Sequence, residues 1–144
     1  MLVGRPHPRL GTVELRAPDA QTESWRVASL AALAQCLVAT ANEHPPGEPP
    51  VHGGEQGAKG RAARYGLDAR LHDFSSGRKI QAREAVRALI TELRPVSQHL
   101  RCEAELEEPV EMTRAETGAE MQRAVYRRRR SMKDVVGHLA AETA

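Results

Sequence analysis

Residues 5–22 read RPHPRLGTVELRAPDAQT, and this stretch decides where the chain is extended. Pro6 and Pro8 fix backbone angles that exclude a helix and favour an extended form. Over residues 10–16 apolar and polar side chains alternate, as they do in a strand whose side chains point to opposite faces in turn. Pro18 ends the pattern, so a strand is predicted at 10–16.

The predicted strand carries the most informative pair of residues in the chain. We expect Val13 and Leu15 to anchor it from behind, while Glu14 and Arg16 project side by side from the other face. A carboxylate can hold a hard cation such as Mg²⁺, and a guanidinium can form two hydrogen bonds to a phosphate or a carboxylate. The pair therefore suits phosphoryl transfer. The same spacing is also typical of an exposed ion pair, and both interpretations stay open on the spacing alone.

Two long helices are predicted from apolar residues at three- and four-residue steps. The first helix runs from an N-cap at Thr22 to about Asn42. Its apolar stripe comprises Trp25, Ala28, Leu30, Leu33, Leu37 and Val38. The second helix spans 82–100, where Pro95 is expected to kink or divide it. Its stripe comprises Val86, Leu89, Ile90, Leu93, Val96 and Leu100.

The segments around the second long helix are shorter. Residues 44–57 are rich in proline and glycine and are predicted to form a flexible loop. Residues 58–66 could form a short helix closed by a glycine, followed by two short extended pieces on either side of a Ser-Ser-Gly turn. Helices at about 118–129 and 132–142 begin where a hydroxyl stands three residues before a carboxylate. These two capping pairs are Thr117 with Glu120 and Ser131 with Asp134.

Composition excludes several classes of protein. The 144 residues are 28% charged with a net charge of +2, which indicates one globular domain. Aromatic residues make up only 3%, so a core must be built from alanine, leucine and valine. No apolar run of about 18 residues and no signal peptide is found, so we expect a cytoplasmic protein without a membrane span.

Cysteines, histidines and arginines give fewer signals. Cys36 and Cys102 are far apart in sequence and belong to no CxxC pair, so both are predicted to be reduced thiols, with Cys36 in the core. The histidines form no metal-binding spacing. Four arginines at 127–130 could contact nucleic acid, but on a helix they spread around the circumference, which favours a solvated helix end.

The stretch at 5–22 resembles the segment RPHPR-x-GTVE-x-R-x-x-DAQ of the carboxylate-amine ligase family, also called type 2 glutamate–cysteine ligases. Four later segments follow the order and spacing of that family: RAARYGLDARL, GRKIQAREAVRALITELRP, TGAEMQRAVY and DVVGHLAAET. The resemblance implies an α+β chain with part of a glutamine-synthetase-like catalytic fold. In that fold an antiparallel sheet forms the floor of an active-site funnel and helices pack behind it.

The resemblance also implies an activity. Family members use ATP and Mg²⁺ to phosphorylate a carboxylate, typically that of glutamate, and an amine such as that of cysteine then attacks the acyl phosphate. On that pattern Glu14 binds metal, and Arg16 is the catalytic residue that contacts the phosphate or the substrate carboxylate. Arg5, His7 and Arg9 form a positive rim beside the nucleotide. Arg61 and Arg64 are lesser candidates.

The sequence also departs from the family pattern. The family's glutamate-rich strand, T-x-G-x-E-x-E, is missing, and one carboxylate cannot complete the coordination of several Mg²⁺ ions. The chain is therefore expected to be the C-terminal portion of a ligase, with little activity alone. Within 1–144 we expect a strand and a helix over 1–43, the loop over 44–57 and a mainly helical part over 58–144.

Partners follow from the same expectation. The ligase would act on a glutamate-like acid and a cysteine-like amine, and a second copy or a complementing N-terminal ligase chain could complete it. The alternative function is a non-catalytic helical module that binds another protein through an unfinished strand edge. Nucleic-acid binding through 127–130 is the lesser alternative.

Overall fold

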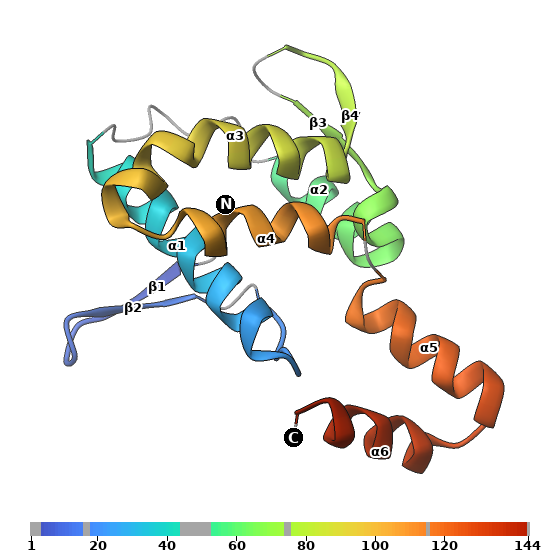
Figure 1. Ribbon diagram of the computed structural model, residues 1–144. Coiled ribbons are helices and arrows are strands. Elements are labelled where there is room, and N and C mark those ends of the chain that lie inside the picture. Colours follow the sequence, from blue (N-terminus) through green and yellow to red (C-terminus); the bar gives the residue numbers. More distant parts are fainter. Residues whose placement is uncertain (1–3, 16–17, 44–52, 74–75, 115, 144) are drawn as a thin grey trace.

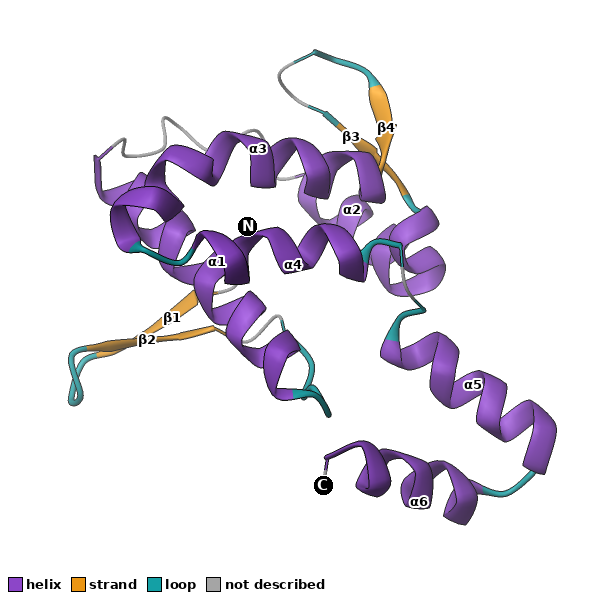
Figure 2. Cartoon of the chain, in the orientation of Figure 1, coloured by secondary structure: helices purple, strands orange, loops and turns teal. Residues whose placement is uncertain are grey.

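The chain is mostly helical, with its few strands confined to two short hairpins (Figures 1 and 2). The computed structural model describes residues 4–15, 18–43, 53–73, 76–114 and 116–143. The elements in chain order are β1 (Gly4–His7), β2 (Thr12–Leu15), α1 (Ser24–Glu43), α2 (Gly53–Tyr65), the 3-10 turn η1 (Gly66–Asp68), β3 (Arg70–His72), β4 (Lys79–Gln81), α3 (Ala82–Leu100), α4 (Glu103–Met112), α5 (Gly118–Arg129) and α6 (Met132–Thr143). This architecture confirms the α+β class.

The core lies where α1, α3 and α4 pack against one another. Its centre is formed by Cys36, Ile90, Leu93 and Leu106, which are at most 2% exposed. These side chains are aliphatic or small, as the shortage of aromatic residues requires. Since apolar burial stabilises a fold in proportion to area, this three-helix contact is the main source of stability in the described residues.

Helix α3 has the bounds predicted from its apolar stripe, and that stripe faces the core. Pro95 lies within the helix and does not divide it. Its ring stands on the exposed side, and Ser97 Oγ donates a hydrogen bond to Arg94 O, 2.8 Å away, just beside it. The helix ends at Leu100, and Arg101 caps it with a left-handed backbone (φ 57°). The Arg101 amide donates to the carbonyls of Gln98 and Ser97.

Helix α1 was predicted correctly as a helix, and its buried face was predicted in part: Leu33 and Leu37 of the predicted stripe pack against the core. It begins at Ser24 rather than directly after Thr22, and Trp25 and Val38 are exposed. The fully buried residues of this helix are small or polar: Arg26, Ser29, Ala32 and Cys36. Apolar residues of α1 lie on more than one of its faces. Their periodicity alone therefore does not indicate which face α3 and α4 cover. The prediction that Cys36 lies in the core is confirmed.

Helix α4 was not predicted. The segment EAELEEPVEM reads as an acidic stretch interrupted by a proline. In the structure its acidic side chains face outward, while Leu106 and Pro109 are buried against the neighbouring helices. Only two or three apolar residues in ten carry the packing, which is too few for a clear helical pattern.

The prediction of a proline- and glycine-rich loop at 44–57 is partly wrong. Residues 44–52 lie outside the described residues, but α2 already begins at Gly53. The helix predicted at 58–66 is therefore longer than expected, and it ends before Gly66, which adopts a left-handed φ of +56°. The two extended pieces that follow are β3 and β4, paired antiparallel with Leu71 opposite Ile80. Residues 53–57 are helical although three of them are glycines, which have a low helix propensity.

The last two helices follow their predicted starts. At α5, Thr117 Oγ1 accepts a hydrogen bond from the Glu120 amide at 3.3 Å, and Glu120 Oε2 accepts one from the Thr117 amide at 2.7 Å. At α6, Ser131 Oγ accepts from the Asp134 amide at 3.2 Å. The two helices pack mainly against each other. Together they form a separate helical hairpin below the core in Figure 1.

One helix among the described residues has the length and apolarity of a membrane span. Helix α1 has 20 residues and a mean hydropathy of 1.2 in its most apolar window. The expectation that no segment is long and apolar enough is therefore wrong as a statement of composition. A core helix has the same properties, and the packing of α1 against α3 and α4 agrees with that role.

Candidate functional site

The predicted site residues lie on an antiparallel hairpin made by β1 and β2. The Cα register places Arg5 opposite Glu14 and His7 opposite Thr12. The turn is closed by the amides of Leu10 and Gly11, which both donate to His7 O at 3.0 Å. Gly11 has a φ of +62°, where a side chain would be strained. The prolines at 6 and 8 thus mark a strand and a turn, and the hairpin itself was not foreseen.

The register brings two of the predicted residues together. The Cα positions of Arg5 and Glu14 are directly opposed in the ladder. His7 lies two residues farther along β1, and Arg9 lies in the turn; both are exposed. Arg16 falls outside the described residues, so its predicted position beside Glu14 stays a prediction. The hairpin thus gathers a basic and an acidic position within a few residues.

The predicted anchoring of this strand is wrong. Val13 is 60% exposed and Leu10 at the turn is 70% exposed, while Leu15 is only half-buried. The hairpin extends to one side of the helices in Figure 1, and its strands pack mainly against each other. A two-stranded ladder of this length is marginal in water without further strands or a packed face. The hairpin therefore has the character of an incomplete sheet.

Metal-binding groups do not cluster among the described residues. No group of three or more histidine, cysteine or acidic side chains that could hold an ion is found there. Glu14 is exposed and could offer one carboxylate. Mg²⁺ needs near-octahedral oxygen coordination, so the described residues do not form a complete magnesium site.

The two lesser arginine candidates have local contacts away from the hairpin. Arg61 Nε donates to Arg70 O at 3.0 Å, which joins α2 to β3. The Arg64 guanidinium lies 5.5 Å from the centre of the Tyr65 ring. Both arginines belong to a helix that packs on η1 and β3, so these contacts support a structural role.

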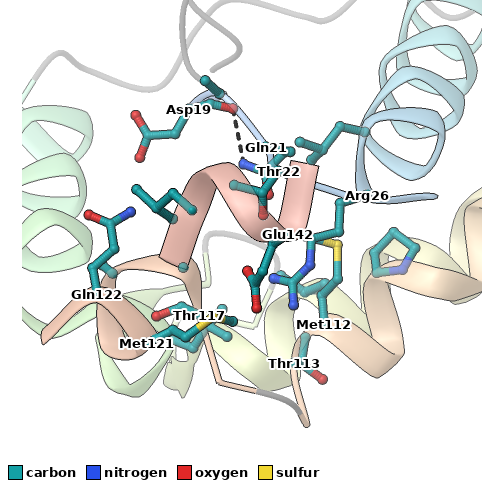
Figure 3. A pocket seen from close by; sticks show the side chains of 18 of the residues that line it. Asp19, Gln21, Thr22, Arg26, Met112, Thr113, Thr117, Met121, Gln122 and Glu142 are labelled. Carbon is teal, nitrogen blue, oxygen red and sulfur yellow. Dashed lines mark hydrogen bonds between the residues drawn. The ribbon is translucent and has the colours of Figure 1, made fainter. Parts of the chain in front are cut away.

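A cavity of about 460 Å³ lies between the start of α1, the end of α4 and the α5–α6 pair (Figure 3). Its apolar walls include leucine and methionine side chains from four helices. The polar residues of its lining are Asp19, Gln21, Thr22, Arg26, Thr113, Thr117, Gln122 and Glu142. No sequence pattern predicts a cavity here, although Asp19 and Gln21 belong to the DAQ segment of the family resemblance.

Charged residues of both signs line this cavity. Arg26 is 8% exposed and donates from Nε to Glu23 Oε2 at 2.5 Å. A hydrogen bond with Trp25, and then the Arg26 guanidinium, holds the pKa of Glu23 below its ordinary value against the opposing effect of burial. Glu142 reaches into the cavity in Figure 3, and its Oε2 is buried with no hydrogen-bond partner in the described residues. The cavity thus combines apolar walls with one basic residue, Arg26, and two acidic residues, Asp19 and Glu142.

The rim of the cavity is shaped by local hydrogen bonds. Gln21 Nε2 donates to Asp19 O at 3.0 Å, the dashed line in Figure 3, and folds the segment before α1 into a turn. Arg83 joins α3 to the far rim through a hydrogen bond to Thr113 O and a 3.2 Å ion pair with Asp68. These contacts fix the cavity to the helical core, whereas the predicted site residues lie on the hairpin.

Comparison with known proteins indicates a class of ligases. The chain is 54% identical over 140 residues to glutamate–cysteine ligase 2-3 of Rubrobacter xylanophilus, a match that covers 97% of this chain and 38% of that protein. It is 40% identical over 141 residues to glutamate–cysteine ligase 2-1 of the same organism, covering 96% and 38%. A glutamate–cysteine ligase 2 of Thermobifida fusca is 35% identical over 142 residues, covering 96% and 36%.

The family model for glutamate–cysteine ligase family 2 matches residues 1–142. The chain therefore belongs to glutamate–cysteine ligase family 2, as the resemblance of 5–22 and the later segments predicted. It spans less than two fifths of the length of the three relatives named above.

Proposed function

We propose that the chain is the C-terminal part of an ATP-dependent carboxylate–amine ligase of the glutamate–cysteine type. The observation that carries the proposal is the family match over 1–142, together with a hairpin that opposes Arg5 and Glu14. ATP would transfer its terminal phosphoryl group to the carboxylate of a glutamate-like acid. The amine of a cysteine-like substrate would then attack the acyl phosphate and release inorganic phosphate.

Each hairpin residue has a role in this proposal. Glu14 supplies one carboxylate to Mg²⁺, and Arg16 stabilises the transferring phosphoryl group. Arg5, His7 and Arg9 form the positive rim for the nucleotide. The short exposed ladder supports a further point, since additional strands would both stabilise it and carry the remaining carboxylates. We expect those strands to come from a complementing N-terminal ligase segment.

The test is a complementation assay that measures ADP release with glutamate, cysteine, ATP and Mg²⁺. The purified chain alone is expected to release little ADP. The chain is then mixed with a segment of the 54% identical Rubrobacter xylanophilus relative, namely the segment that precedes the part matched by this chain. The mixture is expected to show Mg²⁺-dependent ligation. In the mixture, Glu14→Gln should lower the rate by roughly 100-fold, the scale on which removal of one electrostatic group in a reaction centre acts.

The matched control is Glu108→Gln, which removes an exposed carboxylate from α4 without touching the hairpin. It should leave the rate unchanged. Robust ligation by the chain alone would contradict the proposal that it is incomplete. Equal rates for wild type and Glu14→Gln in an active mixture would remove Glu14 from the mechanism.

A non-catalytic binding module is the second candidate function. The exposed Val13 and Leu10 on a hairpin with open edges favour it, because such an edge can pair with another chain. The partner would be a second copy or a complementing ligase chain. Light scattering tests this function directly, and a folded monomer that does not bind the N-terminal segment would contradict it.

The arginines at 127–130 give less support to nucleic-acid binding. They are exposed at the C-terminal end of α5, where positive side chains stabilise the helix dipole, and the Arg130 amide donates to Tyr126 O at 2.7 Å. We expect no retardation of nucleic acid at low salt. As part of the same proposal we place the chain in the cytoplasm, where ATP is available and where its two free cysteines would be reduced until an oxidant reaches them.

A further inference from the structure

Two cysteines that are 66 positions apart in sequence lie in contact in the helical core. Cys36 Sγ, on α1, is 3.7 Å from Cys102 Sγ, at the junction of α3 and α4. Both are free thiols. The contact lies within the most closely packed part of the fold, since α1 and α4 are neighbours along much of their length. Neither cysteine has a role in the proposed ligase reaction.

The two thiols differ in their access to solvent. Cys36 is 0% exposed, whereas Cys102 is half-buried at the edge of the same cluster. Burial, and then the hydrogen bond with Cys102, raises the pKa of Cys36 to about 11. Because the thiolate is the form that reacts with oxidants, Cys36 is protected from direct attack. Cys102 is the thiol that an oxidant from solvent can reach.

We propose that Cys36 and Cys102 form an oxidation site, at which hydrogen peroxide closes an intramolecular disulfide that joins α1 to the α3–α4 junction. First, the Cys102 sulfur attacks the peroxide: an S–O bond forms, the O–O bond breaks and water leaves, which gives a sulfenic acid. Next, the Cys36 sulfur attacks Cys102: the S–S bond forms, the S–O bond breaks and a second water leaves. The peroxide is reduced, and both thiol hydrogens end in water.

The geometry allows the second step without unfolding. The two sulfurs are 3.7 Å apart. A disulfide bond is about 2.05 Å long, so the sulfurs must approach each other by roughly 1.65 Å. Rotation of the Cys102 side chain shortens the distance most easily, because Cys102 is the N-cap residue just before α4 and lies outside the regular helix. Cys36, held within α1, serves as the fixed partner.

The folded core also favours this partner over a thiol on another molecule. Two groups held in contact have an effective concentration far above that of dissolved protein. The sulfenic acid of Cys102 is therefore captured within the chain. The inference concerns the helical core and does not depend on ligase activity.

The experiment treats the purified chain with a small molar excess of hydrogen peroxide and digests it with trypsin without reduction. Cleavage at arginine and lysine places Cys36 in the peptide 27–59 and Cys102 in the peptide 102–114. Mass spectrometry of the monomer fraction should find these two peptides joined, with the loss of two hydrogen atoms, and dithiothreitol should separate them. Thiol titration in denaturant should fall from two groups to none.

Two controls link the result to the folded geometry. The same oxidation in urea should form the intramolecular bond roughly tenfold more slowly, because the contact is lost. Cys36→Ser, checked for folding by circular dichroism, should leave Cys102 as a sulfinic acid or in dimers between chains. The wild-type peptide map decides the question even where that variant does not fold.

Three results would overturn the inference. Two thiols that still titrate after peroxide treatment would exclude the reaction. Cys102 recovered as a sulfinic acid beside a free Cys36 would show that the buried thiol does not capture it. A disulfide found only between two chains, or one formed as fast in urea as in buffer, would show that the native contact of Cys36 with Cys102 does not promote disulfide formation.

Discussion

Arg94 forms a two-point ion pair with Glu107 that joins α3 to α4: Nε lies 2.7 Å from Oε1, and Nη2 lies 3.2 Å from Oε2. The hydrogen bond from Arg94 holds the pKa of Glu107 below its ordinary value of 4.5, against the opposing effect of burial. Both side chains are about half exposed, so the pair is screened and its contribution is small. The pair nevertheless marks the contact between the two helices that frame the core.

The first prediction concerns acid stability. A carboxyl whose pKa is lowered on folding stabilises the fold above its unfolded pKa, and this contribution is lost as pH falls through the folded pKa. Glu107→Gln should therefore lower the urea midpoint slightly near neutral pH and leave it unchanged well below pH 4.5. The control is Glu108→Gln, the exposed neighbour on α4. Equal losses for Glu107→Gln at both pH values would contradict the ion-pair explanation.

The second prediction tests the position of the core. Leu106 is 0% exposed between the helices, whereas Leu10 at the hairpin turn is 70% exposed. Leu106→Ala should lower the free energy of unfolding by about 2–5 kcal/mol, because it removes apolar contacts and leaves a cavity. Leu10→Ala should change it by less than about 0.5 kcal/mol. Urea unfolding measures both, and similar losses for the two variants would place the core elsewhere.

The third prediction concerns the hairpin turn. Gly11 has a φ of +62°, and an alanine there should cost the hairpin about 1 kcal/mol through backbone strain. The β1–β2 ladder should become less populated, as nuclear magnetic resonance would show from the amide of Gly11 and its neighbours. The urea midpoint of the helices should not change, since the hairpin packs mainly on itself. A lower helical midpoint would show that the hairpin is part of the same cooperative unit.

The fourth prediction is a substitution that increases stability. Gly60 lies inside α2, and no atom lies within 4 Å of a Cβ added there. Gly60→Ala should raise the stability of α2 by roughly 1 kcal/mol, because alanine loses less backbone entropy in a helix. Circular dichroism should report greater helicity in the far ultraviolet. Lower helicity would mean that this segment is not helical in solution.

The fifth prediction concerns the start of α5. Thr117→Ala removes the side-chain acceptor for the Glu120 amide and should weaken the helix by about 1 kcal/mol. Hydrogen exchange of the α5 amides should become several-fold faster, while exchange in α3 stays the same, because α5 packs mainly on α6. Thr91→Ala, at an exposed site within α3, is the control. Equal acceleration in both regions would contradict a local role for this cap.

Much of the helical part could be predicted because the signals are local. Helix α3 shows its bounds through apolar side chains at helical steps, and α5 shows its start through Thr117 and Glu120. Helix α4 escaped prediction because its packing rests on Leu106 and few other residues in an acidic segment. The buried face of α1 was predicted only in part: Leu33 and Leu37 pack against the core, whereas Trp25 is exposed, because the covering helices select which apolar residues are buried.

The candidate site could be predicted only in part. The strand at Glu14 was visible in the alternation of side chains, but the pairing that opposes it to Arg5 depends on a turn at Gly11 whose geometry the sequence does not specify uniquely. The cavity beside Arg26 and Glu142 and the contact of Cys36 with Cys102 join segments distant in sequence. Such contacts depend on how whole helices cross.

The separation of the β1–β2 hairpin from the helices has a consequence for how this chain tolerates change. Substitutions at sites that share no contacts have additive effects on stability, so a hairpin change such as Gly11→Ala and a core change such as Leu106→Ala should show no coupling in a double-mutant cycle. The residues that would carry the chemistry can therefore vary without a penalty to the helical core, and the core can be repacked without moving the candidate site.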